Sequence, residues 1–378
     1  MKFTDDIRNN PIARGLSARI RDAVERRRRY RLMGFCRSHA LAIARHDLAS
    51  LLPPQIELIH GPGCPGCVLP ASRIDHAIDL ALERGVTLCA SEDTLGVPGA
   101  RHANLLAARA AGADIVTPGA VADALALARA HPQREIVWLA TGFETAAPAT
   151  AEALMLTRAL AIGNFSVLCN HVLTPAAMRF LLADDALGER ALLNGFLAPS
   201  HVSQVIGVAP YRSISGDFVK PVVIAGPEPL DVLQAVLMLV EQINECRADT
   251  ENQYRRAVTE AGDTKAKRLV DEVFDVRASF VWRGLGPVPH SALALRPAFA
   301  NWDAERRHAL ALPEMTIDIA PVSATATCAG KALRTASGAT CTPFAPLELC
   351  KGATAGPCTD ARAGDLRTAR RGVSRQLP

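Results

Sequence analysis

The sequence predicts an α/β protein: two similar α/β domains with parallel sheets that face each other across a cleft, plus a third domain that is helical and rich in cysteine. From about residue 55, strand-like apolar segments alternate with amphipathic helices, as in parallel sheets. Two such cycles of similar size follow each other. After about residue 320 the composition shifts to Ala, Thr, Gly and Pro, and four cysteines fall in that segment. We expect the first α/β domain at 36–130, the second at 131–225, and the third from 1–35 together with 226–378.

The first cycle has three strand–helix repeats. Its expected strands are QIELI, VTLCA and ADIV, and the expected helices are SRIDHAIDLALERG, HANLLAARAAG and VADALALARAHP. Ile74, Ile78 and Leu82 recur on one face of the first helix, which Ser72 can cap at its start and Gly85 at its end.

The second cycle begins with EIVWLA as a buried strand. FSVLCN and PVVIAG are further expected strands, and the expected helices are APATAEALMLTRALA and PAAMRFLLAD. A long helix over PLDVLQAVLMLVEQINECR follows, and we assign it to the third domain together with residues 1–35, which are expected to be helical and basic.

Composition narrows the function classes. The net charge of +4 is nearly balanced, and the run of arginines at 26–29 is expected on a solvated helix face, so nucleic acid is not an expected partner. The polar start MKFTDDIRNN is not expected to act as a signal peptide, and no apolar run is long enough to cross a membrane. We therefore expect a cytoplasmic protein. Its ten cysteines then favour metal binding or thiol redox chemistry over structural disulfides.

Unusual loops follow the expected strands, at the sheet edge where parallel α/β folds bind ligands. HGPGCPGC places Cys64 and Cys67 just before a helix, and their spacing allows either shared metal binding or a small disulfide. TGFET places Glu144 in a loop, where it could serve as a general acid or base or as a hydrogen-bond anchor. PSHVS places His201 in another loop. A hydrolytic Ser/His site there is a weak interpretation, because the sequence has no Gly-x-Ser-x-Gly elbow.

Other cysteines are less informative by themselves. FCRSH sets Cys36 three residues before His39, and taken alone this pair is better explained by a core cysteine and an unrelated surface histidine. Cys89 and Cys169 lie in expected strands and are expected to be buried as small apolar residues. The four cysteines of the C-terminal segment sit among few aliphatic residues, so a thiolate-bound iron–sulfur cluster or zinc is expected to hold that segment together.

Together these motifs resemble the HypD family of NiFe-hydrogenase maturation proteins, from about Arg31 to Cys358. CRSH is similar to the family motif Cys-Gly-x-His, with Arg37 in place of Gly. GPGCPGC matches Gly-Pro-Gly-Cys-Pro-x-Cys, and GFET and PSHVSQVIG match two further family motifs. EPLDVLQAVLMLV, ENQYRRAV and WRGLG are also similar. So many separate motifs in the same order make the resemblance highly specific.

The resemblance implies a metal-centre assembly scaffold with thiol redox chemistry rather than a conventional turnover enzyme. Together with a HypC-like chaperone, such a chain holds iron while cyanide and carbon monoxide ligands are attached. A HypE-like protein donates the cyanide, and the Fe(CN)2CO centre then passes to the hydrogenase large subunit. The resemblance implies that the site for this assembly consists of the motif residues Cys36, His39, Cys64, Cys67, Glu144 and His201. Its three cysteines are the implied iron ligands.

The resemblance also implies a 4Fe-4S cluster in the C-terminal segment. CTPFAPLELC and CKGATAGPC match the family spacing, which implies Cys341 and Cys358 as cluster ligands, and Cys328 fills one of two upstream ligand places. The segment is shorter than in the family, and Ala355 stands where the family has Glu. Either Cys350 completes the ligand set, or the cluster is weak or absent.

Two alternatives remain beside this interpretation. One is an iron–sulfur thiol–disulfide oxidoreductase of another pathway that uses Cys64 and Cys67. The other is a degenerate, cluster-less interaction paralogue, which the shortened C-terminal segment suggests.

Overall fold

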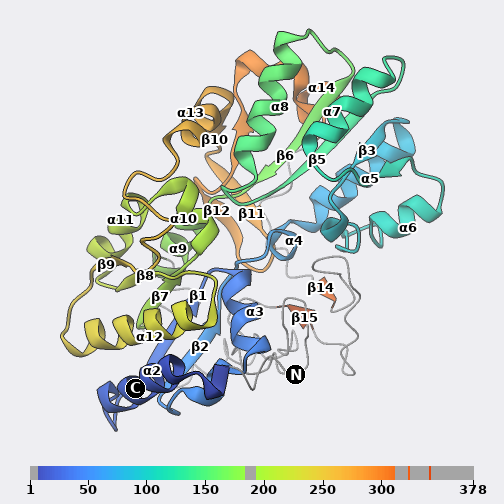
Figure 1. Cartoon of the computed structure of the whole chain (residues 1–378). Helices are drawn as coiled ribbons and strands as arrows, with labels where there is room; N and C mark the ends of the chain where they lie inside the picture. Colours follow the sequence, from blue (N-terminus) through green and yellow to red (C-terminus); the bar gives the residue numbers. More distant parts are fainter. Residues whose placement is uncertain (1–6, 184–192, 311–321, 324–339, 342–378) are drawn as a thin grey trace, which may run out of the picture. The chain divides into compact units, whose positions relative to one another are not determined.

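The computed structural model describes residues 7–183, 193–310, 322–323 and 340–341, and these form two compact units (Figure 1). Unit 1 contains the described residues up to Cys64 and Ala177–Asp263. Unit 2 contains Pro65–Ala176 and the described segment that begins at Thr264. Helix α9 (Thr174–Ala183) runs from one unit into the other. Each unit therefore combines segments that are far apart in the sequence.

Unit 1 is built on a five-stranded parallel sheet in the order β2-β1-β7-β8-β9. Its strands are β1 (Tyr30–Gly34), β2 (Ile56–His60), β7 (Gly195–Ala198), β8 (Val222–Ile224) and β9 (Thr250–Asn252). Its helices are α2 (Pro11–Ala23), α3 (Arg37–Arg45), η1 (Leu48–Leu51), α10 (Ser200–Ile206), α11 (Ala209–Phe218) and α12 (Pro229–Asn244).

Strand β1 corrects the expectation that residues 1–35 are helical. It pairs in parallel with β2 and with β7, so it lies inside the sheet. Its one half-buried position, Arg31, lies opposite Glu57 of β2, and the two side chains form an ion pair at 2.9 Å. This cross-strand pair explains how a charged residue is accommodated in a strand with four buried positions.

Helices α2, α3 and α12 cover one face of this sheet with a shared apolar core. Helix α12 lies side by side with α2 in Figure 1, and the two pack together. Pro229 stands in the first turn of α12, and the carboxylate of Asp231 accepts a hydrogen bond from the backbone N–H of Glu228 at 3.3 Å. The expected long helix is thus present, but it belongs to an α/β unit.

Unit 2 is built on a four-stranded parallel sheet in the order β4-β3-β5-β6. Its strands are β3 (Thr87–Cys89), β4 (Ile115–Val116), β5 (Ile136–Gly142) and β6 (Phe165–His171). Two apolar cores cover its faces. One core includes α7 (Val121–Ala130) and α8 (Ala147–Ala159), and the other includes α5 (Ala71–Glu83) and α6 (Leu105–Ala110). The remaining helices are α4 (Pro65–Val68), η2 (Glu92–Thr94), α13 (Thr264–Val273), η4 (Pro297–Trp302) and α14 (Ala304–Arg307).

Two antiparallel strand pairs extend unit 2, and the sequence did not lead us to expect them. They pair β10 (Phe274–Val276) with β13 (Leu293–Leu295), and β11 (Ser279–Trp282) with β12 (Gly286–Pro289). Two further short strands are β14 (Val322–Ser323) and β15 (Thr340–Cys341).

The prediction of an α/β fold with two parallel sheets is confirmed. The expected range 36–130 supplies strands to both sheets, because β2 joins the first sheet and β3 and β4 join the second. The cleft and the separate cysteine-rich domain stay predictions, and most of the cysteine-rich segment lies outside the described residues. Among the described residues, no helix combines the length and the apolar character needed to span a bilayer.

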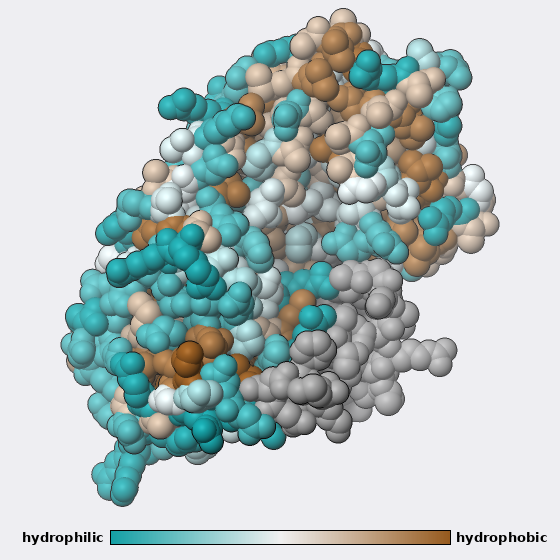
Figure 2. Space-filling model, in the orientation of Figure 1, coloured by the Kyte–Doolittle hydropathy of each residue, from teal (hydrophilic) through white to brown (hydrophobic). Residues whose placement is uncertain are grey.

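In Figure 2, hydrophobic residues gather over the part of unit 2 that holds α7 and α8, and a smaller hydrophobic patch lies among the hydrophilic residues of unit 1. Leu156 of α8 is 45% exposed, and Leu160, which follows that helix, is 48% exposed.

Candidate functional site

The candidate site in unit 1 lies where the parallel strands β1 and β2 end. Gly34 and His60 are register partners at the ends of these strands. The chain continues from Gly34 into Phe35 and Cys36, and from His60 into the Gly-Pro-Gly-Cys loop. Because both strands run in the same direction, their carboxyl ends bring the CRSH and GPGC motifs to the same edge of the sheet.

The glycines of the loop allow its backbone to lie directly against the backbone before Cys36. The N–H of Gly61 donates a hydrogen bond to the carbonyl of Gly34 at 2.9 Å. A Cβ atom placed on Gly63 would lie 2.8 Å from the carbonyl oxygen of Phe35 and 2.9 Å from the backbone nitrogen of Cys36. Real Cβ atoms do not approach backbone so closely, so only glycine fits there. Cys64, the next residue, is thereby held beside the Cys36 segment.

Cys36 is the N-cap residue of α3 and is 8% exposed. Its Sγ lies 3.9 Å from the hydroxyl oxygen of Ser200, at the start of α10. The Nδ1 atom of His201 lies 3.2 Å from that same hydroxyl and 3.5 Å from the hydroxyl of Ser38. The thiol is therefore surrounded by small polar groups from α3 and α10.

These groups change the acidity of the thiol. Burial alone raises the pKa of Cys36, but the charge of His39 and a hydrogen bond with His201 act in the opposite direction. Hydrogen bonds with the backbone of His39 and the side chain of Ser38 add to them, and together they lower the pKa of the Cys36 thiol from 9.0 to about 5. The hydrogen bond with Cys36 in turn raises the pKa of the exposed His201. Cys36 is thus a thiolate at neutral pH, which is the reactive and metal-binding form of cysteine.

The two cysteines of the strands provide a contrast inside the same chain. Burial raises the pKa of Cys89 to about 12 and that of Cys169 to about 11. Both side chains are almost fully buried in the core of unit 2, as expected from the sequence. A buried position therefore does not by itself produce a thiolate in this protein.

His39 is buried in the first turn of α3. Its Nε2 lies 3.0 Å from the carbonyl oxygen of Ala225, which follows β8. A carbonyl oxygen can only accept, so Nε2 must carry the hydrogen. The expectation that His39 is an unrelated surface residue, which applied to the motif taken alone, is wrong.

The Cys-x-x-Cys pair spans the boundary between the units. Cys64 is buried and is the last residue of that segment of unit 1, whereas Cys67 is half-buried in α4 of unit 2. The prediction that Cys36, Cys64 and Glu144 open on one cleft stays a prediction.

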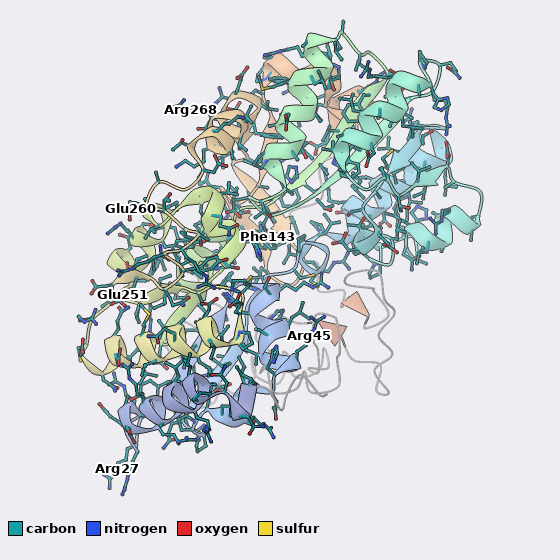
Figure 3. The ribbon with its side chains drawn as sticks, in the orientation of Figure 1. Arg27, Arg45, Phe143, Glu251, Glu260 and Arg268 are labelled. Carbon is teal, nitrogen blue, oxygen red and sulfur yellow. The ribbon has the colours of Figure 1, made fainter. Side chains whose placement is uncertain are left out.

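Glu144 lies in unit 2, in the loop that follows β5 and next to Phe143, which is labelled in Figure 3. Its buried carboxylate accepts hydrogen bonds from the backbone N–H of Thr174 at 2.6 Å and from the hydroxyl of Thr174 at 2.9 Å. Burial raises the pKa of Glu144 to about 7, although these hydrogen bonds oppose the rise. Of the two roles expected from the sequence, the geometry of the side chain is that of a hydrogen-bond anchor, here at the start of α9.

The cysteines expected to hold an iron–sulfur cluster cannot be placed in the same way. Cys328, Cys350 and Cys358 lie outside the described residues, and Cys341 lies in the short strand β15. In the part of the chain that the structure describes, no three His, Cys, Asp or Glu side chains gather as they would to hold a metal ion by themselves.

Sequence reasoning missed two serines of the site. Ser38 lies inside the CRSH motif, and Ser200 immediately precedes His201 in the PSHVS motif. Their positions inside the motifs were the available signal. By contrast, the hydroxyl of Ser203 is buried and donates to the carbonyl of Pro199 at 2.5 Å, so it is not placed to act as a nucleophile beside His201.

Comparison with known proteins gives consistent results. A HypD model described as "Hydrogenase formation hypA family" matches residues 11–363. The chain is 48% identical over 362 residues to the hydrogenase expression/formation protein HupD of Azotobacter chroococcum mcd 1, covering 95% of each protein. It is 50% identical over 311 residues, or 82% of each protein, to the hydrogenase maturation factor HypD of Azotobacter vinelandii. It is 39% identical over 323 residues to the HypD of Escherichia coli K12, covering 84% of this chain and 85% of that protein.

Proposed function

The chain belongs to the HypD family of hydrogenase maturation factors, and from this premise we propose that it is the scaffold on which the Fe(CN)2CO centre of a NiFe hydrogenase is assembled. The observation that carries the proposal is the thiol of Cys36, whose pKa is lowered to about 5 although the residue is buried. It is presented at the edge of a sheet, against the backbone of the loop that holds Cys64.

The proposed substrate of this site is an iron atom with its cyanide and carbonyl ligands. Such iron is a soft centre and prefers thiolate sulfur. Cys36 supplies a thiolate that needs no further deprotonation at neutral pH, and His39 and His201 stabilise its negative charge. Cys64 and Cys67 supply further thiols, which bind the iron or exchange between dithiol and disulfide as electrons are needed.

A partner protein completes the proposed coordination, so that the iron is shared between two proteins. We propose that a HypC-like chaperone supplies the missing thiol, that a HypE-like protein supplies the cyanide, and that the finished centre passes to the hydrogenase large subunit.

We also propose that the C-terminal segment holds a 4Fe-4S cluster. Four thiols in one segment, those of Cys328, Cys341, Cys350 and Cys358, are the donor set that such a cluster requires. When bound, the cluster would supply electrons for the thiol chemistry.

Maturation of a hydrogenase in cells tests the proposal directly. Replacing Cys36 or Cys64 with Ala should abolish hydrogenase activity, because each change removes a proposed iron ligand. Cys89→Ala is the matched control: it also removes a buried thiol, but one whose raised pKa keeps it protonated. This substitution should leave a small cavity and lower the free energy of unfolding by about 1 kcal/mol. Full hydrogenase activity with Cys36→Ala would contradict the ligand role.

A further inference from the structure

His39 is held by a peptide group that has a second, equally specific contact. The carbonyl of Ala225 accepts the hydrogen bond from Nε2 of His39 at 3.0 Å. The N–H of the same peptide group, that of Gly226, donates to the side-chain oxygen Oε1 of Gln253 at 2.9 Å. A peptide group is planar, so the direction of its N–H also sets the direction of its carbonyl. Gln253 therefore acts on His39 through one rigid peptide group.

Gln253 is itself fixed from the other side. Its Nε2 donates to Oδ1 of Asp231 at 2.8 Å, and its backbone N–H donates to the carbonyl of Ile224 at 2.9 Å. With its oxygen facing Gly226 and its nitrogen facing Asp231, the amide of Gln253 has one orientation that satisfies both partners.

Asp231 is a firm anchor for this arrangement. It is 5% exposed, in the first turn of α12. Its carboxylate receives Nη1 of Arg256 at 2.8 Å and Nη2 at 2.5 Å. Burial acts to raise the pKa of Asp231, but the hydrogen bonds from Arg256 and Gln253 outweigh it and lower the pKa, so the side chain remains a carboxylate. A bidentate contact between a guanidinium and a carboxylate is strong and directional.

The peptide group has little room to turn. A Cβ atom on Gly226 would overlap the carboxylate of Asp231 and would lie 2.7 Å from the ring of Tyr254. The guanidinium of Arg256 stacks over that same ring, with 4.4 Å between its carbon and the ring centre. The loop after β9 thus closes over the loop after β8.

We propose that Gln253 is a positioning residue for His39: by holding the peptide group between Ala225 and Gly226, it keeps the acceptor of the Nε2–H hydrogen bond in place and so holds the imidazole beside Cys36. The remaining nitrogen, Nδ1, is buried and has no hydrogen-bond partner among the described residues. Without the amide of Gln253 the carbonyl of Ala225 is free to tilt, and the ring loses the one hydrogen bond that sets its orientation. This inference deepens the proposed function and rests on it only for its biological purpose.

The test compares three variants of the full chain. Gln253→Met keeps the length of the side chain but removes both hydrogen bonds. Gln253→Glu keeps an acceptor for the N–H of Gly226. The matched control is Asn252→Leu, one residue earlier, because the side chain of Asn252 donates to the carbonyl of Val258 at 2.9 Å and has no hydrogen bond to the peptide group of Gly226.

Two measurements report on the histidine and on the thiol, without iron or hydrogenase. Nitrogen NMR of histidine-labelled protein distinguishes hydrogen-bearing from bare ring nitrogens, with the His39 signals assigned from a His39 variant. The rate of Cys36 alkylation by iodoacetamide is followed by mass spectrometry of the peptide at about pH 5, close to the pKa of the thiol, where a change of pKa alters the thiolate fraction most.

We expect Gln253→Met to mix or broaden the His39 ring signals and to slow Cys36 alkylation by about threefold or more, since neighbouring charges and hydrogen bonds control thiolate content. Gln253→Glu keeps the acceptor for Gly226 but sets a second carboxylate against Asp231, so it should disturb the His39 signals less than Gln253→Met does. Asn252→Leu should retain the wild-type signals. Unchanged His39 signals and alkylation in Gln253→Met would overturn the inference, as would equal effects in Asn252→Leu. Because neither readout needs iron, the positioning role can fail while the proposed scaffold function stands.

Discussion

Cys36 differs from the buried cysteines of the strands in the groups that surround its thiol. Histidines and serines from α3 and α10 face it, whereas Cys89 and Cys169 lie among apolar side chains. The motif CRSH predicted the position of Cys36 and His39. It could not predict that the thiol meets Ser200 and His201, which lie more than 160 residues away in the sequence, because that contact depends on the parallel pairing of β1 with β7.

The thiol environment predicts an unusual pH profile. Since the pKa of Cys36 is lowered to about 5, its thiolate is already the main form above that pH, and its alkylation rate should level off by about pH 6 to 7. Cys89 and Cys169 serve as internal controls: both are buried in the core of unit 2 and have raised pKa values, so neither should be alkylated while the protein stays folded. His201→Ala should shift the pH profile of Cys36 alkylation towards higher pH, because it removes a hydrogen bond that lowers the pKa of the thiol. A Cys36 rate that rises through pH 8 or 9, as for an ordinary thiol, would disprove the stabilised thiolate.

Glu144 predicts a pH-dependent stability of unit 2. Its pKa is raised from 4.5 to about 7 in the folded protein, so the folded state binds more protons than the unfolded state between these values. The contribution of Glu144 to the free energy of unfolding is therefore fully present below pH 4.5 and is lost as the pH rises through about 7. At 1.36 kcal/mol per pKa unit, it amounts to roughly 3 kcal/mol.

Chemical denaturation at several pH values between 5 and 8 measures this effect. Glu144→Gln removes the titration and keeps an oxygen that can accept from Thr174, so its free energy of unfolding should fall less over this range than that of the wild type. Parallel curves for the two proteins would show that Glu144 is not the titrating group.

At the scale of elements, local patterns predicted many of the helices and buried strands but missed others of both kinds. The helix α5 was expected from the spacing of its apolar residues, and Gly85 follows its end with a φ of +63°, as a glycine at a helix end commonly does. The expected cap Ser72 was wrong by two positions, because Pro70 occupies the N-cap. The strand β1 was missed because YRLMG is short and directly follows a run of arginines. Its identity as a strand depends on neighbours that are distant in the sequence.

The contact between the GPGC loop and the Cys36 segment can be tested by adding one methyl group. Gly63→Ala would place a Cβ atom 2.8 Å from the backbone of Phe35, so the loop must move away from Cys36. Strain of this kind costs about 1–3 kcal/mol. We expect hydrogenase maturation to fall strongly while the protein stays folded.

Gly216→Ala is the matched control, because a Cβ atom there, in the last turn of α11, meets nothing within 4 Å. It should leave maturation intact and stabilise the helix by about 0.5–1 kcal/mol. Normal maturation with Gly63→Ala would mean that the close approach of the two segments is not needed.

At the scale of the whole molecule, the α/β class followed from the alternation of strands and helices, but the membership of each unit did not. Unit 1 gathers strands from 30–60, 195–198 and 222–252, with all of β3 to β6 inserted between them in the sequence. Parallel strands can be joined by crossover connections of very different lengths, so hydrophobic periodicity gives no information on their order in the sheet. The result is that the two cysteines of one Cys-x-x-Cys motif belong to different units.

The central claim is that this chain carries the iron centre during its assembly, with Cys36 as a ligand. Infrared spectroscopy of the protein purified without oxygen, together with its HypC-like partner, tests the claim most directly. The wild-type complex should show cyanide and carbonyl bands, which the complex with Cys36→Ala should lack, while that with Cys89→Ala keeps them. Bands that persist unchanged in Cys36→Ala, or a wild-type complex that carries none, would contradict the account.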